Sequence, residues 1–315
     1  MVSKISILIT TRDRATFLCN LLESISLNTR NPNQIIVVSS GSLIDDVVKP
    51  YRDSFNWEFF HLDEVGQSAQ KKFGISKVDP MSEWVIFLDD DVIVSDNFIE
   101  DIESRIERSE FDRVVGVGFR LTSYSKKTLG IKSKFLSTIL SLTGLHGFAS
   151  QLGIFLPYRF SSKKIQVKWV NGLSMWRKDT LNLYELPFYN SKYAALEDVI
   201  FAQKARKLGK LMYEPNIILR DQNLFVALNI DLMQLKYYSL WKFWTLKKCS
   251  KFIFFIAFLI HTIHCIKLVF TGSDSYLNSA QVLMKLLKYQ FEVLGIYIRS
   301  RGVFENRIVE LLRIL

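Results

Sequence analysis

Three consecutive aspartates, Asp89, Asp90 and Asp91, directly follow the apolar segment 84–88 (WVIFL). Carboxylates this close repel one another and raise each other's pKa values unless a cation lies between them. Mg²⁺ and Mn²⁺ prefer oxygen ligands and bind through one or two carboxylates together with substrate phosphates. Such an ion would neutralise a diphosphate leaving group. The triplet therefore predicts a divalent-cation and phosphate site. A solvated acidic turn or a helix cap is the simpler alternative.

A second pair of carboxylates, Glu197 and Asp198, lies on a helix predicted over residues 194–208. A carboxylate near a basic, partly buried site can act as a general base. Two acids in a first helical turn can equally do no more than complement the helix dipole. The local sequence by itself favours this second reading.

The segment 169–177 (WVNGLSMWR) holds two further candidates, Gly172 and Arg177. A glycine allows a ligand to approach the backbone closely, and an arginine can pair with phosphate. A plain core strand over 169–176 explains the same residues.

Apolar strands alternate with amphipathic helices through the first 121 residues. We predict strands at 5–11, 34–40, 58–62, 84–88 and 114–121, and helices at 15–28, 42–51, 67–76 and 96–110. Repeated units of this kind predict a mostly parallel sheet with flanking helices, an α/β fold of Rossmann-like type. Ligands of such sheets bind beyond the carboxyl ends of the strands. We therefore expect residues 10–14, 39–42 and 89–91 to meet at one edge. Two short strands, 211–213 and 217–219, are expected around Pro215.

The composition describes a folded chain that needs no disulfides. Of 315 residues, 49% are hydrophobic and 13% are aromatic, which argues against disorder. The three cysteines are far apart in the sequence and favour a reducing compartment. The first residues lack the features of a signal peptide, so we expect a cytoplasmic protein.

The net charge of +10 is unevenly distributed along the chain. Residues 1–119 hold 12 basic and 20 acidic residues, whereas 120–180 hold 11 and 1, and 226–315 hold 12 and 5. Basic segments can attract nucleic acid or anionic lipid. These ones alternate with apolar stretches and contain no nucleic-acid-binding motif, so we expect no nucleic acid partner.

The C-terminal part, 226–315, has the composition of a helical, membrane-associating region. Residues 252–266 lack Lys, Arg, Asp and Glu and would span about 22 Å as a helix, less than the ~30 Å of a bilayer core. We predict an interfacial or re-entrant anchor. The alternatives are a full span, extended to Phe270 with Lys267 snorkelling, and a buried helix of a soluble fold. Lysines at 126–134 followed by the uncharged stretch 135–158 predict a second surface of this type, suited to a lipid-linked pyrophosphate acceptor.

Taken in order, these segments resemble glycosyltransferase family 2, whose members have the GT-A fold and use nucleotide-sugar donors. The resemblance covers about residues 3–225. It rests on SILITTRDRATFLCNLLESI, QIIVVSSGS, GQSAQKKFGI, WVIFLDDDVIVSDNFIE (84–100), VKWVNGLSMWRKDTL (167–181) and LEDVIFAQKARKLG (196–209).

The resemblance implies a role for each matching residue. Thr10, Thr11 and Arg14 would approach the nucleotide, and Gly172 would line the acceptor side of the donor pocket. Asp89, Asp90 and Asp91 match the family's DxD motif: Asp89 would face the ribose or the cation, and Asp91 would ligate the cation. Glu197 and Asp198 match the ED motif, with Asp198 as the base for a single inverting displacement.

Three departures from the family pattern concern the same site. Ser39 stands where an aspartate often contacts the base, and Lys71 stands where an arginine is expected. Arg220 and Asp221 occupy the place of a histidine that often completes the metal site, so either Asp221 ligates the ion or Arg220 contacts the diphosphate. The motif of processive synthases is not evident, which favours the transfer of one sugar.

The sequence thus predicts a GT-A domain over 1–225 and a helical membrane-associated region over 226–315. The expected activity is a metal-dependent, inverting glycosyl transfer to a hydroxyl of a lipid-linked surface glycan at the inner face of the cell membrane. Polyprenyl phosphate as the acceptor, a sugar-phosphate nucleotidyltransferase, and a partner protein with a degenerate site are the alternatives.

Overall fold

The structure of the chain is a computed structural model. It describes residues 4–51, 57–63, 66–123, 158, 161–186, 196–222, 236, 238–240, 242–243, 251–271 and 280–299. These residues fall into two compact units. The first unit contains the described residues of 1–148, 156–192 and 198–224, and the second contains those of 149–155, 193–197 and 225–315.

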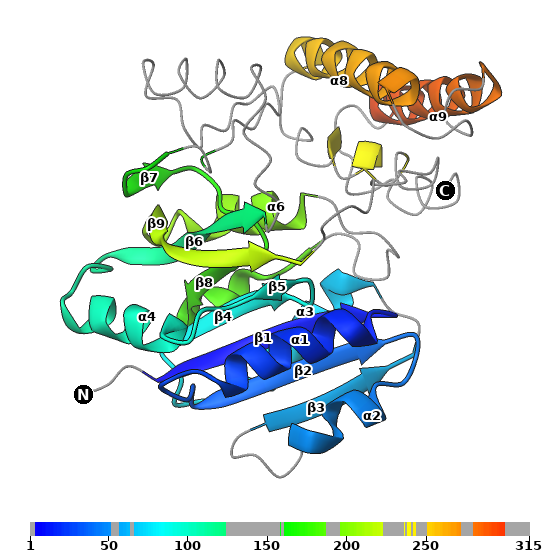
Figure 1. The fold of residues 1–315 in the computed structure, drawn as a ribbon. Coiled ribbons are helices and arrows are strands. Elements are labelled where there is room, and N and C mark those ends of the chain that lie inside the picture. Colours follow the sequence, from blue (N-terminus) through cyan, green and yellow to red (C-terminus); the bar gives the residue numbers. More distant parts are fainter. Residues whose placement is uncertain are drawn as a thin grey trace. The chain divides into compact units, whose positions relative to one another are not determined.

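A nine-stranded mixed sheet forms the centre of the first unit (Figure 1). The strands are β1 (Ile5–Arg12), β2 (Gln34–Ser40), β3 (Trp57–Leu62), β4 (Trp84–Asp89), β5 (Val92–Ile93), β6 (Val114–Ser123), β7 (Ile165–Val167), β8 (Ser174–Arg177) and β9 (Lys210–Asp221). They lie in the order β3-β2-β1-β4-β8-β6-β9-β5, and β7 also pairs with β9. β1 to β4 are parallel, as the alternation of strands and helices predicts.

The strand directions bring distant residues to one edge of the sheet. β8 runs antiparallel to both β4 and β6, and β9 runs parallel to β6. β6 and β9 therefore point the same way as β1 and β4. Their carboxyl ends lie at the same edge, where Thr10 pairs with Asp89 and Ser123 pairs with Asp221. This edge is the one that the sequence predicts for ligand binding.

Helices cover both faces of the sheet. They are α1 (Ala15–Ser26), α2 (Asp45–Val48), α3 (Gln67–Ile75), α4 (Phe98–Glu107) and α6 (Glu197–Ala205), with 3-10 turns η1 (Lys49–Tyr51) and η2 (Lys178–Leu183). The apolar sides of α1 and α4 share one core cluster with Ile7 and Ile9 of β1. α3 packs on the other face, where Gly74 allows the helix to approach Leu8.

Three elements differ from the sequence prediction in their bounds or type. The helix predicted over 42–51 is a short α2 followed by a 3-10 turn containing Pro50, which has no N–H to continue an α-helix. The strand predicted over 169–176 begins only at Ser174. The two strands expected around Pro215 are one strand, β9, whose pairing with β6 is irregular at the proline, as bulges allow.

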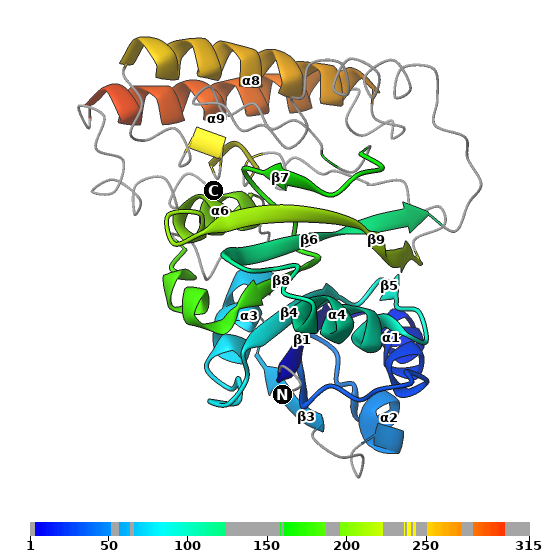
Figure 2. The same ribbon diagram turned by 90° about the vertical axis from the view of Figure 1, so that its left-hand side faces the viewer.

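The second unit contains two long helices, α8 (Lys251–Thr271) and α9 (Ala280–Arg299), which lie side by side (Figure 2). The rings of Phe254 and Tyr297 stack across the two helices with centroids 3.5 Å apart. Among residues 228–246, the described positions 236, 238–240, 242 and 243 are helical. Within the described part of the chain, no helix is both long enough and apolar enough to cross a membrane. The surface predicted over 126–158 lies outside the described residues, except for Tyr158.

The close approach of β6 to β8 depends on Gly116. A Cβ atom at this position would lie 2.5 Å from the ring of Trp176, which is fully buried. Because the ring also packs on Phe201 of α6, with centroids 4.4 Å apart, it has no free space to enter. We expect Gly116→Ala to lower the free energy of unfolding by about 1–3 kcal/mol, measured by urea denaturation.

Gly295→Ala is the matched control for this substitution. A Cβ at Gly295, inside α9, would have its nearest neighbour at 3.9 Å, so this variant should match or exceed the wild-type stability. An unchanged denaturation midpoint for Gly116→Ala would show that the contact between β6 and β8 is not tight.

Candidate active site

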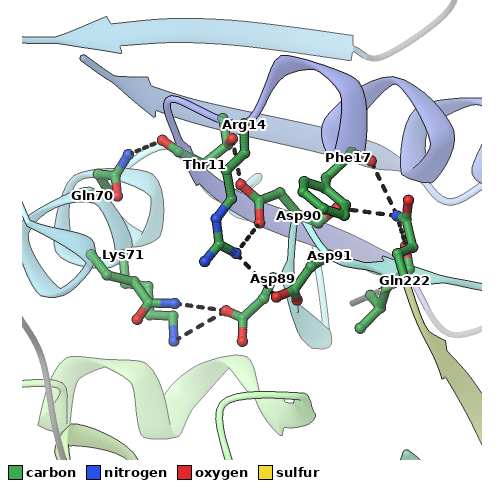
Figure 3. A network of polar contacts seen from close by, with 11 residues as sticks. Thr11, Arg14, Phe17, Gln70, Lys71, Asp89, Asp90, Asp91 and Gln222 are labelled. Atoms are coloured by element: carbon green, nitrogen blue, oxygen red, sulfur yellow. Dashed lines mark hydrogen bonds and ion pairs between the residues drawn. The ribbon is translucent and has the colours of Figure 1, made fainter. Parts of the chain in front are cut away.

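The aspartate triplet forms the turn between β4 and β5, at the predicted edge of the sheet (Figure 3). Asp89 ends β4, Asp90 and Asp91 make the turn, and Val92 begins β5. β5 pairs with the end of β9, where Val92 lies opposite Asp221. The pairing of β5 with β9, which is more than 100 residues later in the sequence, therefore holds the turn in place.

Asp90 is the buried member of the triplet, and the first loop of the chain holds it. Its Oδ2 accepts a hydrogen bond of 2.6 Å from the Thr11 hydroxyl, and its Oδ1 accepts one of 3.1 Å from Arg14. The same Arg14 nitrogen donates to Asp91 Oδ2 at 3.0 Å. The Arg14 guanidinium thus bridges two neighbouring carboxylates and offsets part of their repulsion.

Asp89 faces a different set of partners, on α3. Gln67 donates to Asp89 Oδ1 at 2.7 Å, and the Lys71 ammonium lies 3.9 Å from the same oxygen. The Lys71 side chain is only 3% exposed, so the nearby Asp89 carboxylate offsets part of the free-energy cost of burying the ammonium. A Cβ at Gly172 would lie 3.2 Å from Lys71 Nζ, which shows how closely the backbone approaches this pair.

Two amides, the partly exposed Gln222 and the buried Gln70, complete the framework, and neither was predicted as a site residue. Gln222, just after β9, donates to the backbone carbonyls of Phe17, Asp90 and Val92 at 3.1, 3.3 and 2.9 Å. Gln70 of α3 donates to the carbonyls of Thr11 and Val38 at 2.6 and 3.0 Å. Each amide joins segments that are far apart in the sequence, so no local pattern reveals its role.

The electrostatic strain of the triplet concentrates on Asp91. Burial, and next the negative charges of Asp89 and Asp90, raise the pKa of Asp91 from 3.8 to about 6, against the opposing effect of Arg14. The charge of Asp221 raises this pKa further, so the end of β9 is electrostatically coupled to the turn. Burial also raises the pKa of Asp90, although Thr11 and Arg14 act in the opposite direction.

The loop after β2 is tied to the loop after β1. Asp13 Oδ1 accepts hydrogen bonds from the backbone N–H of Ser42 at 2.8 Å and from its hydroxyl at 2.9 Å. Gly41 between them has φ +78°, and a Cβ there would lie 2.3 Å from Asp13 Oδ1. Ser39 is buried and contacts the next strand, with its hydroxyl 3.2 Å from the Phe60 carbonyl and 3.0 Å from His61 Nδ1.

The structure thus brings together most of the residues predicted for the donor side. Thr10, Thr11, Arg14, Lys71, Gly172, Asp221 and the three aspartates lie at one edge of the sheet. Thr10 is 4% exposed, and its hydroxyl makes no hydrogen bond with the described residues.

Arg177 is not part of this group. It pairs with Trp84 at the start of β4, whereas Asp89 is at the end of that strand. β8 is antiparallel, so its carboxyl end lies at the opposite edge of the sheet. There the Arg177 guanidinium lies 4.7 Å from the centre of the Trp84 ring.

Glu197 and Asp198 begin α6, after Leu196 with φ +63°. Asp198 Oδ1 accepts a hydrogen bond of 2.7 Å from the backbone N–H of Val199, and Asp198 is half-buried. Glu197 is buried and belongs to the second unit, whereas Asp198 belongs to the first. α6 is held to the sheet through Phe201, which contacts Trp176 and Tyr184.

The carboxylates fit a divalent cation that is completed by substrate. No group of three or more His, Cys, Asp and Glu side chains in the described part of the chain is arranged to hold a metal ion. Mg²⁺ and related ions do not require such a cage, because one or two carboxylates with substrate phosphates suffice. The carboxylates of Asp89, Asp90 and Asp221, whose charges raise the pKa of Asp91, provide oxygen ligands of this kind at one edge of the sheet.

Comparisons with known proteins agree with this architecture. The family model of glycosyl transferase family 2 matches residues 6–160. The fold is similar to S. aureus TarS 1–349 in complex with UDP-GlcNAc, at 13% identity and a TM-score of 0.51, over 98% of this chain and 90% of that one. It is also similar to GalNAc-T7 with UDP, GalNAc and Mn²⁺, at 12% identity and a TM-score of 0.57, over 95% of this chain and 58% of that one.

The chain is shorter than some of these proteins. It covers 43% of a longer S. aureus TarS structure, which it matches over 90% of its own length at 13% identity and a TM-score of 0.50. Likenesses at such low identity show the fold alone. No curated protein matches the sequence significantly.

The parallel-rich sheet with its acidic turn at the carboxyl edge is consistent with the GT-A class. The matched residues 6–160 include β1 to β6 and the whole aspartate triplet. The chain belongs to glycosyl transferase family 2 and is a glycosyltransferase.

The strain at Asp91 has a measurable consequence for stability. Its pKa is about 6 in the folded protein against 3.8 ordinarily, so between these values the folded state holds the extra proton. The free energy of unfolding of the metal-free protein therefore falls as the pH rises from about 4 to 6, because Asp91 must ionise in the folded state. This loss of stability persists at neutral pH. We expect Asp91→Asn to raise the free energy of unfolding at pH 7.5 by up to about 3 kcal/mol.

Thermal denaturation in the presence of a chelator measures this effect. The gain in melting temperature should shrink as the pH is lowered from 6 to 4, and the exposed Asp112→Asn should show no such gain. A lower melting temperature for Asp91→Asn at pH 7.5 would contradict the assignment of strain to this carboxylate.

Proposed function

We propose that this glycosyltransferase moves one sugar from a nucleotide-sugar donor to a hydroxyl of a lipid-linked glycan, with inversion and with the aid of Mg²⁺ or Mn²⁺. The observation that carries the proposal is the strained aspartate turn at the carboxyl edge of the sheet. The matched family and the TarS structure with UDP-GlcNAc support a nucleotide-sugar as the donor.

The donor side of the proposed site follows from the contacts around the triplet. Asp91 and Asp221 are the proposed cation ligands, with Asp89 turned toward the ribose or the ion. A bound cation would neutralise charge on the diphosphate leaving group. Arg14, half exposed beside Asp91, is placed to contact the diphosphate. Arg177 is omitted, because it lies at the other edge of the sheet.

Buried residues around the triplet are assigned to positioning in this proposal. Lys71 lies beside the Asp89 carboxylate, and the Thr11 hydroxyl donates a hydrogen bond to Asp90. With these contacts already in place, neither carboxylate has to change its conformation when a donor binds. Ser39 lies where a base-contacting aspartate often occurs. A neutral hydroxyl already placed against Phe60 and His61 would read a base differently.

Asp198, with Glu197 beside it, is the proposed base. It would take the proton from the acceptor hydroxyl, whose oxygen then forms a bond to the anomeric carbon as the bond to the diphosphate breaks. Its support is the place of the pair at the start of α6, held against the sheet by Phe201. Gly172 lines the acceptor side, where a side chain would crowd Lys71 and Asp89.

For location, we propose a peripheral or anchored position at the inner face of the cell membrane. Residues 1–225 would form the catalytic domain and 226–315 the membrane-associated region. The excess of basic residues in 226–315, together with its apolar helices, supports this division.

Donor binding is tested by thermal denaturation with UDP, GDP, CDP and dTDP, each with and without Mn²⁺. One diphosphate should raise the melting temperature by several degrees with Mn²⁺, because a ligand that binds only the folded state stabilises it. Asp91→Asn should abolish this shift, while Asp112→Asn should retain it. If no nucleotide shifts the transition, the metal-dependent donor site is wrong. Release of pyrophosphate from a nucleoside triphosphate and a sugar phosphate would instead indicate a nucleotidyltransferase.

The base is tested by Asp198→Asn. We expect kcat to fall by about 10²–10⁴-fold, because the amide cannot accept the proton, while the Kd of the nucleotide with Mn²⁺ stays at the wild-type value. Sugar transfer to an extracted lipid-linked acceptor, or hydrolysis of the donor, provides the rate. A wild-type rate in the variant would remove Asp198 from the mechanism.

A further inference from the structure

One side of α8 exposes an unusual amount of apolar surface. Residues 252–266 of α8 contain no Lys, Arg, Asp or Glu, and their polar residues are His261, Thr262 and His264. One half packs inside the second unit through Phe254, Ala257, Phe258 and Cys265. The other half exposes large hydrophobic side chains: Phe252 (73% exposed), Phe255 (49%), Leu259 (44%), Ile260 (41%) and Ile263 (66%). The helical periodicity places these five on a single side.

α9 adds a second exposed apolar stripe with positive charge beside it. Met284, Phe291 and Ile298 are spaced by seven residues, so they form a line along the helix, and they are 65, 59 and 57% exposed. Lys285 and Lys288 are exposed next to this line. The Phe291 ring lies 5.9 Å from that of Phe258 on α8, so the stripe borders α8 directly.

Such a surface requires an occupant. Neighbouring large hydrophobic side chains that are exposed together mark sites of interaction with proteins or membranes. The charges beside the patch distinguish between them. α9 has a single acid, Glu292, α8 has none between 252 and 266, and residues 226–315 hold 12 basic against 5 acidic residues. Apolar side chains flanked by lysines are the pattern of helices that lie in the interface of an anionic bilayer.

We infer that the exposed faces of α8 and α9 are a docking surface for an anionic lipid bilayer. The apolar side chains enter the boundary between headgroups and acyl chains, and Lys285 and Lys288 pair with lipid phosphates. The two helices lie along the membrane and do not cross it. This inference deepens the proposed membrane location and rests on it, but it requires nothing of the donor site.

Vesicle sedimentation of the full-length chain tests the surface. One set of vesicles is phosphatidylcholine alone, and the other is phosphatidylcholine with an equal amount of phosphatidylglycerol. The wild type should bind the anionic vesicles more tightly. The triple variant Phe255→Gln/Leu259→Gln/Ile263→Gln should weaken binding to the anionic vesicles by about a hundredfold, because three apolar side chains that would enter the bilayer are lost. Lys285→Gln/Lys288→Gln should cost about fivefold per lysine, and only on anionic vesicles.

Matched controls come from exposed residues of the first unit. Leu43→Gln/Met81→Gln/Leu208→Gln and Lys163→Gln/Lys207→Gln should bind vesicles as the wild type does. The melting temperature and the nucleotide-induced shift of each variant show that it is folded, and they test the donor site separately from the membrane surface.

The inference is overturned if the wild type does not sediment with anionic vesicles, or if the apolar triple variant binds them as tightly as the wild type does. It is also overturned if the wild type is a dimer without lipid and the triple variant is a monomer, since the surface would then join two copies of the chain. Vesicle binding without any nucleotide-induced shift would support the surface and reject the proposed donor site.

Discussion

The repulsion between three neighbouring carboxylates is the constraint around which the first unit is organised. The buried Asp90 accepts a hydrogen bond from Thr11, and Asp89 lies close to the buried Lys71 ammonium. The Arg14 guanidinium bridges Asp90 and Asp91. These partners come from β1, the loop after it and α3, so the turn is stable only when the sheet is assembled. Burial and the charges of Asp89 and Asp90 still raise the pKa of Asp91 to about 6, although Arg14 acts in the opposite direction.

That remaining charge links stability to function. A protein shaped only for stability would replace Asp91 by a neutral residue, because burial and its neighbours disfavour the carboxylate. Keeping a strained group at a binding edge is how sites prepare for a cation or a developing charge. The neutral framework of Gln70 and Gln222 serves the same purpose, because it fixes the backbone of the loops without adding charge.

The second unit follows a different physical logic. Its buried side is a conventional packing of aromatic rings, such as Phe254 on Tyr297. On its exposed side, large hydrophobic side chains such as Phe252 and Ile263 are mostly in contact with solvent, which is energetically unfavourable. The acidic site in the first unit and the exposed apolar surface in the second are the two features on which the proposed transfer to a lipid-linked acceptor rests.

Local sequence was sufficient for the elements and for the acidic turn. Continuous apolar runs mark β1, β2 and β4, because both faces of these strands are buried, and the helical spacing of apolar residues marks the helices that follow them. The acidic residue types of Asp89, Asp90 and Asp91 indicate the site. The sequence does not predict the direction of β8, because its antiparallel pairing with β4 and β6 depends on residues far away in the chain. That pairing places Arg177 at the far edge, although it is only five residues from Gly172. The contacts of Lys71, Gln70 and Gln222 likewise exist only in the folded chain. The partners are separated in the sequence by 18 residues for Lys71 and Asp89, by 32 for Gln70 and Val38 and by 205 for Gln222 and Phe17, so only the tertiary structure brings them together.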